Sequence, residues 1–152
     1  MPEIDFPPKV CGIVDERSEI AAMYRGVPQN DIGMFSDVID NVPKSIGINM
    51  LIRSMAPEII VCDEIGGNED IEAIEKMALS GVKGIFTAHG GSIEEIYQNE
   101  NLKRLIDSKI IRKIIILDSK QKGKIKETID VPIIKKLVFL YTLINYYFLC
   151  NL

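Results

Sequence analysis

The chain has 152 residues, of which 47% are hydrophobic and 26% are charged, and its formal net charge is −4. This length suits one domain with a proper core. The acidic balance weighs against a nucleic-acid-binding protein. With a single histidine and three widely spaced cysteines, the sequence lacks the spacing of the common zinc sites. We therefore expect a globular protein with reduced thiols, a cytosolic setting and no nucleic-acid partner.

The first third of the chain predicts a strand, a loop and a helix. Residues 9–15 (KVCGIVD) are an apolar run that ends in an acid, which indicates a buried strand. Residues 25–44 are rich in Gly, Pro, Asn and Asp and predict a long loop, of the kind that is often functional. Apolar residues spaced three and four apart over 44–55 predict a helix, which Pro57 ends.

The most informative run is 58–64 (EIIVCDE), in which four apolar residues lead into Asp63 and Glu64. Such a run predicts a strand inside a parallel sheet, and open α/β sheets place their ligands at the carboxyl edge. Because successive strand residues face opposite ways, Asp63 could hold magnesium through water while Glu64 orients an attacking water. This is the chemistry of a Walker B strand. An ordinary strand that ends in a polar turn would look the same, so the context must decide.

The second half continues to alternate between helices and strands. We predict a helix over 69–80, a strand over 83–87, a helix over 92–107, an apolar strand over 110–117 and an antiparallel edge strand over 123–130. Asn68 is expected to cap the first of these helices and Gly81 to stop it, and Ser92 with Glu95 forms a capping box for the second. This alternation predicts an α/β fold with a mainly parallel sheet.

The last segment, 137–152, is nearly all apolar and follows two lysines. It is shorter than the roughly 20 residues that a spanning helix needs, and it has an asparagine in its middle. We expect an added helix, docked or at a membrane interface, rather than a span. The composition of the tail is also that of AT-rich codons, as a frame change near residue 131 would give. The predicted organisation is a domain over 1–130 and an apolar tail over 131–152.

Four motif runs occur in a fixed order: 13–21 (IVDERSEIA), 24–31 (YRGVPQND), 51–66 (LIRSMAPEIIVCDEIG) and 87–90 (TAHG). With these runs the sequence resembles the stage III sporulation protein AA family of endospore-forming Firmicutes, over about residues 9–120. The resemblance implies a secretion-type ATPase with a RecA-like P-loop core. Such an ATPase would use ATP and Mg²⁺ to energise assembly of, or transport through, the channel between mother cell and forespore.

The resemblance also implies roles for individual residues. Asp63 would assist magnesium, through water, and Glu64 would polarise the attacking water. Asp15 and Glu16 match an acidic box near the nucleotide, and His89 matches a box that senses the phosphate end. Without the resemblance, Asp15 and Glu16 are better explained as a polar strand end, and a lone histidine after a strand is commonly a hydrogen-bonded turn residue.

Three arginines in the matching runs, Arg17, Arg25 and Arg53, are candidate nucleotide-binding residues. One of them could reach a phosphate of a neighbouring subunit as an arginine finger. Each is otherwise explained as a surface ion-pair residue. By resemblance, the intact protein would form a homo-oligomeric ring in the mother-cell cytoplasm, peripheral to the membrane, with other sporulation channel proteins as partners.

One required motif is missing. A P-loop enzyme needs G-x-x-x-x-G-K-[ST], whose backbone N–H groups and lysine hold the phosphates. Here Gly-Lys occurs only at 123–124 and is followed by Ile. In the family this loop precedes the segment that matches 9–19. We therefore expect a carboxyl-terminal part of a family member, without the P-loop strand and without measurable ATP hydrolysis on its own. The alternative is a non-catalytic remnant that binds intact subunits or the channel base.

Overall fold

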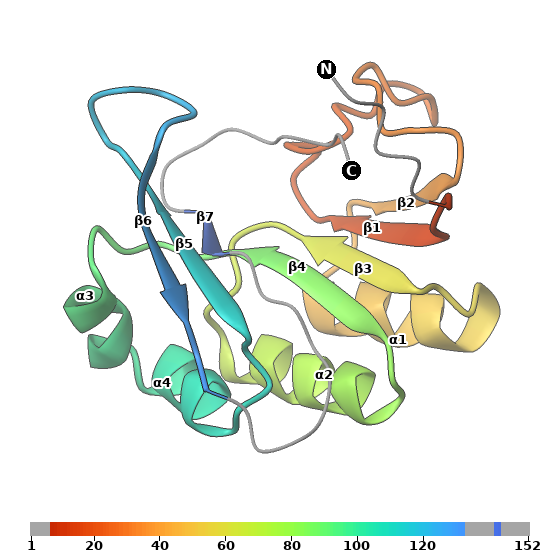
Figure 1. The fold of residues 1–152 in the computed structure, drawn as a ribbon. Coiled ribbons are helices and arrows are strands. Elements are labelled where there is room, and N and C mark those ends of the chain that lie inside the picture. Colours follow the sequence, from red (N-terminus) through yellow and green to blue (C-terminus); the bar gives the residue numbers. More distant parts are fainter. Residues whose placement is uncertain (1–6, 133–141, 144–152) are drawn as a thin grey trace.

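The computed structural model describes residues 7–132 and 142–143, and its centre is a parallel sheet (Figure 1). The strand order is β2-β1-β3-β4-β7, and each pair of neighbours in this sheet is parallel. Its strands are β1 (Cys11–Asp15), β2 (Ser36–Asp40), β3 (Ile59–Cys62), β4 (Lys83–Thr87) and β7 (Thr142–Leu143). A separate antiparallel pair consists of β5 (Lys113–Leu117) and β6 (Ile125–Asp130). The predicted α/β fold with a mainly parallel sheet is confirmed.

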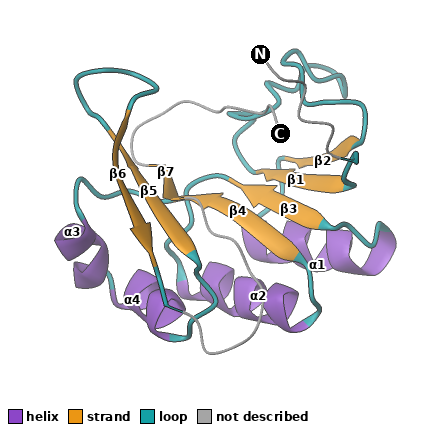
Figure 2. Ribbon diagram, in the orientation of Figure 1, coloured by secondary structure: helices purple, strands orange, loops and turns teal. Residues whose placement is uncertain are grey.

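The helices α1 and α2 cover one face of the sheet (Figure 2). The helices are α1 (Lys44–Ser54), α2 (Asn68–Leu79), α3 (Ile93–Gln98) and α4 (Glu100–Asp107). Because side chains alternate along a strand, Val14 packs into the large core beneath the helices, whereas Ile13 faces the other side. There Ile13 and Val61 form a smaller cluster with Ile20 of the loop that follows β1.

The structure corrects the loop prediction for 25–44, because residues 36–40 form the parallel strand β2. The run Ser36–Asp40 contains only two apolar residues, and its serine and aspartates gave it the composition of a loop. Pairing with β1 and packing of Val38 and Ile39 against the two apolar clusters outweigh that weak local preference.

Two helix predictions are also corrected in detail. The single helix predicted over 92–107 is two helices, because Asn99 has an extended backbone and its side chain accepts hydrogen bonds from the N–H groups of Asn101 and Leu102. The cap predicted at Asn68 is instead provided by Asp70, whose carboxylate accepts the N–H of Gly67, the residue before α2.

The carboxyl-terminal elements agree with the sequence only in part. The predicted antiparallel strand at 123–130 is confirmed as β6, and β5 pairs with β6 rather than with the parallel sheet in the part of the chain that the structure describes. A helix was predicted over 137–152, and most of this segment lies outside the described residues. Only Thr142 and Leu143 of it are described, and they form the strand β7. Within residues 7–132 and 142–143, no helix is long and apolar enough to cross a membrane.

Candidate functional site: the carboxyl edge of the sheet

Four neighbouring strands of the sheet lead into polar residues at the same edge. The strand registers pair Asp40 with Asp15, and they pair Cys62, the last residue of β3, with Val14 and Phe86. Asp63 directly follows Cys62, and Thr87 follows Phe86, so both lie at the same edge. Open α/β sheets bind ligands outside this carboxyl edge. The topology thus gathers three carboxylates that are far apart in the sequence at the place where a ligand is expected.

Asp63 lies directly after β3 and is almost fully buried, since its side chain is only 7% exposed. Neither carboxylate oxygen has a hydrogen-bond partner within the described part of the chain. Its nearest charge is the ammonium of Lys44, whose Nζ lies 3.7 Å from Oδ1. Burial raises the pKa of Asp63, and the charge of Lys44 opposes that shift only in part. Two buried acceptors without a donor are rare in proteins and call for an explanation.

Lys44, the first residue of α1, joins Asp63 to the other acidic segment. Its ammonium donates a hydrogen bond to Glu16, and its side chain is 9% exposed. Burial alone would lower the pKa of Lys44, but the hydrogen bond to Glu16 and the charge of Asp63 raise it above its ordinary value. Sequence reasoning missed this residue, because a lone lysine at a predicted helix start carries no signal of burial.

In the structure, Asp15 stabilises the loop that follows β1. The side chain is fully buried and accepts three backbone hydrogen bonds, from Glu19 at 2.8 Å, Ile20 at 3.1 Å and Ala21 at 2.8 Å. These bonds fix the loop that carries Glu16 and places Ile20 on the sheet. The nucleotide contact of Asp15 stays a prediction. It would involve a carboxylate whose two oxygens already accept backbone hydrogen bonds.

Glu64 makes contacts with two of the predicted site residues. Its Oε1 lies 2.7 Å from Nε2 of His89, and its Oε2 forms an ion pair with Arg17. Its backbone N–H donates to Thr87 Oγ1 at 2.7 Å, and its φ is +32°, in the left-handed region that side-chain-bearing residues rarely adopt. Such backbone strain is concentrated at functional sites. The side chains of Glu64 and His89 are 34% and 66% exposed, so this pair faces solvent.

The other two predicted arginines lie away from these contacts. Arg25 is in the exposed loop before β2, where its guanidinium lies 5.3 Å from the ring centre of Tyr24. Arg53 is in the last turn of α1. It is separated from Lys44 by about 14 Å along the helix, at roughly 1.5 Å per residue. None of the contacts described for the carboxyl edge involves Arg25 or Arg53, so their role in nucleotide binding stays a prediction.

The residues at this edge suit a bound cation better than a bound nucleotide. The unpartnered oxygens of Asp63 are the hard ligands that Mg²⁺ prefers, and Mg²⁺ commonly keeps several waters. In the described residues, no three His, Cys, Asp or Glu side chains converge as a complete metal site. For a triphosphate, the 152 residues lack the G-x-x-x-x-G-K-[ST] loop. The residues therefore fit a water-bridged cation but do not form a phosphate cradle.

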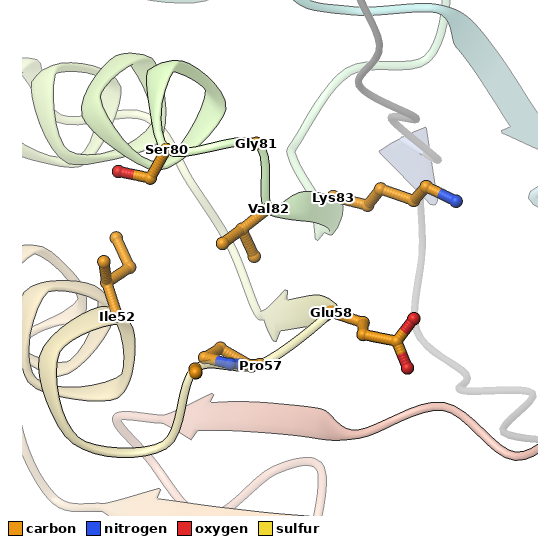
Figure 3. Close-up of a pocket in the computed structure, with 8 residues that line it drawn as sticks. Ile52, Pro57, Glu58, Ser80, Gly81, Val82 and Lys83 are labelled. Atoms are coloured by element: carbon orange, nitrogen blue, oxygen red, sulfur yellow. The ribbon is translucent and has the colours of Figure 1, made fainter.

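A cavity of about 460 Å³ lies at the opposite end of the strands (Figure 3). It is lined by residues around the ends of α1 and α2 and the starts of β3 and β4, among them Ile52, Pro57, Glu58, Val82 and Lys83. Because Glu58 and Lys83 lie at the amino ends of β3 and β4, this cavity is separate from the acidic carboxyl edge.

Taken together, the fold and the site define an α/β protein with an acidic candidate cation site at the carboxyl edge of a parallel sheet. The comparisons with known proteins identify its family. The family model described as "Sporulation stage III, protein AA" matches residues 6–132. The chain belongs to this family, and the resemblance found in the sequence is confirmed.

Two curated relatives are similar over most of the chain. "Stage III sporulation protein AA" of Bacillus subtilis (strain 168) is 45% identical over 116 residues, which is 76% of this chain and 38% of that protein. "Protein SEEDLING PLASTID DEVELOPMENT 1" of Arabidopsis thaliana is 32% identical over 120 residues, 77% of this chain and 17% of that protein. The chain thus spans well under half the length of either relative. No solved structure matches the chain.

Proposed function

We propose that this chain acts in sporulation and supplies the acidic part of an ATP-hydrolysing site with a RecA-like core. The observation that carries the proposal is Asp63: a buried carboxylate at the carboxyl edge, with two unpartnered oxygens, followed directly by Glu64. Membership of the stage III sporulation protein AA family supports the process. The proposed setting is the mother-cell cytoplasm near the membrane, with a ring of subunits and channel proteins as partners.

The proposed roles of these residues follow from how deeply each side chain is buried. Asp63, shielded from bulk water, would hold Mg²⁺ through water, and Lys44 and Glu16 set the charge around it. Mg²⁺, when bound, would neutralise charge on the phosphates. Glu64 is exposed enough to reach a water, yet both its oxygens are engaged by Arg17 and His89. Because each carboxylate oxygen can accept more than one hydrogen bond, Glu64 could orient a water while Arg17 and His89 hold the side chain in place.

The phosphates need contacts that this chain does not offer. Backbone N–H groups and a lysine of a P-loop normally supply most of them. We propose that they come from a further segment of an intact protein, so that the chain alone shows no measurable ATP hydrolysis. Arg17, Arg25 and Arg53 remain candidates for contact with a neighbouring subunit's nucleotide.

A chimera tests the proposal. Residues 9–120 would replace the matching segment of the Bacillus subtilis relative, and ATP hydrolysis would be measured by phosphate release. We expect activity in the chimera and at least a hundredfold loss in Glu64→Gln, because the water would lose its orienting group. Glu69→Gln is the matched control, since Glu69 is exposed on α2. Equal activity in Glu64→Gln and Glu69→Gln would contradict the role of Glu64.

A second candidate function is a non-catalytic subunit-binding remnant. It is favoured by the same missing loop and by the contacts of Glu64 with Arg17 and His89, which give this carboxylate a structural role. This reading predicts that the purified chain binds the intact Bacillus subtilis relative in a pull-down, and that Glu64→Gln leaves this binding unchanged. Binding of ATP by the chain alone would count against it.

A further inference from the structure

Lys44 occupies a position that is unfavourable for a lysine in two respects. It is the first residue of α1, where the helix dipole is positive and disfavours a cation. It is also buried, with a side chain that is only 9% exposed. Burying an ammonium carries a large desolvation cost unless the charge is paired. Something at this site must therefore compensate the charge.

The compensation comes from two carboxylates, those of Glu16 and of Asp63, the residue of the candidate cation site. Glu16 accepts a hydrogen bond from Lys44, and Asp63 lies 3.7 Å from the same ammonium. The Asp63 oxygens have no hydrogen bond within the described residues, so its link to Lys44 is an ion pair without a hydrogen bond. The ammonium of Lys44 thus supplies a positive charge next to the Asp63 carboxylate, the group proposed to hold a cation.

We propose that Lys44 is a resident cation of the Glu16–Asp63 pair and competes with a divalent cation for it. This inference rests on the proposed function, which assigns a divalent cation to Asp63. A divalent ion at Asp63 would lie beside the ammonium and be repelled by it. Its entry therefore requires Lys44 to withdraw. A lysine can do so, because its charge sits on a flexible four-carbon stem.

The competition gives the site two states. In the lysine-bound state, the ammonium of Lys44 neutralises part of the negative charge of Glu16 and Asp63. In the cation-bound state, Lys44 is released from Asp63 and its ammonium becomes available to another anion, such as a phosphate group. Occupation of the site by the metal would thereby be linked to a movement at the start of α1.

The test measures divalent-cation affinity in charge variants of the full chain. Lys44→Gln removes the charge but keeps side-chain length, and Lys44→Arg is the matched control that keeps the charge. Mn²⁺ binding would be followed by electron paramagnetic resonance of free Mn²⁺, with Mg²⁺ as competitor. We expect Lys44→Gln to bind Mn²⁺ about tenfold or more tightly than wild type, because a unit charge some 4 Å away opposes a divalent ion even at high dielectric. Lys44→Arg should stay within about threefold of wild type.

A double variant ties the effect to the proposed site. The gain in Lys44→Gln should be lost in Lys44→Gln/Asp63→Asn, which removes the carboxylate that would hold the ion. If Lys44→Gln binds Mn²⁺ no more tightly than wild type, the competition is refuted, while wild-type binding would leave the proposed cation site intact. If no form binds Mn²⁺, both the competition and the cation part of the proposed function fail.

Thermal unfolding keeps the test decisive if Lys44→Gln folds poorly. Binding to the native state raises the unfolding midpoint. MnCl₂ should therefore raise the midpoint of Lys44→Gln, or restore its helical circular dichroism, more than it does for wild type. An equal or smaller response in Lys44→Gln would refute the inference.

Discussion

The loop after β1 is held by hydrogen bonds to the carboxylate of Asp15. Replacing this residue should therefore lower the free energy of unfolding by a predictable amount. In Asp15→Asn, three buried or partly buried backbone N–H groups lose their ionised acceptor. Hydrogen bonds to a charged group contribute about 1.5–3 kcal/mol each. Asparagine keeps one oxygen as an acceptor, whereas its amide group would face N–H donors. We therefore expect the free energy of unfolding to fall by about 3 kcal/mol.

Urea denaturation followed by circular dichroism measures this loss. Asp37→Asn is the matched control, because Asp37 is exposed on the neighbouring strand β2 and should change stability by less than about 0.5 kcal/mol. A loss below about 1 kcal/mol in Asp15→Asn would refute the structural role. It would then favour the original prediction, in which Asp15 is reserved for the nucleotide.

Two further predictions concern the core and the cation site. Burial raises the pKa of Asp63, so the unfolded chain ionises first and stability falls as pH rises from the ordinary carboxyl pKa to the raised one. Asp63→Asn should therefore be more stable than wild type at pH 7, and this gain in the free energy of unfolding should disappear below the ordinary carboxyl pKa. Urea denaturation at several pH values between about pH 3 and pH 8 measures the difference. If Asp63→Asn is less stable than wild type at pH 7, the ion pair with Lys44 outweighs the cost of burial. In Gly84→Ala, a Cβ would lie 2.3 Å from the Phe86 ring and 2.9 Å from Met77, so overpacking should cost about 2 kcal/mol in the same assay. Gly66→Ala is the control, because its Cβ would meet nothing closer than 3.9 Å, and equal losses in both variants would contradict the packing argument.

The sequence predicted those elements whose local signals agree with their tertiary environment. β1, β3 and β4 are apolar runs that the sheet buries, and all three were found. β2 was missed because its stability comes from pairing with β1, which a short polar sequence does not reveal. The break at Asn99 was missed because the pattern of apolar residues continues across it, while the cap is made by a side chain.

The candidate site was predicted in outline but not in its contacts. The acids at the ends of β1 and β3 could be placed at one edge because parallel strands share their direction. The part played by Lys44 could not be predicted, since its burial arises only when α1 packs against the sheet. The contacts of Glu64 with Arg17 and His89 likewise join three segments whose distances no spacing rule fixes.

The central claim is that this chain provides the acidic half of a nucleotide site and lacks the phosphate-binding half. The most direct measurement is titration with a fluorescent ATP analogue and Mg²⁺ of the chain alone, of the chimera with the Bacillus subtilis relative, and of Asp63→Ala in each. The account predicts saturable binding in the chimera that Asp63→Ala weakens, and no binding to the chain alone up to millimolar concentration. Micromolar binding by the chain alone that is lost in Asp63→Ala, or no binding by the chimera, would contradict it.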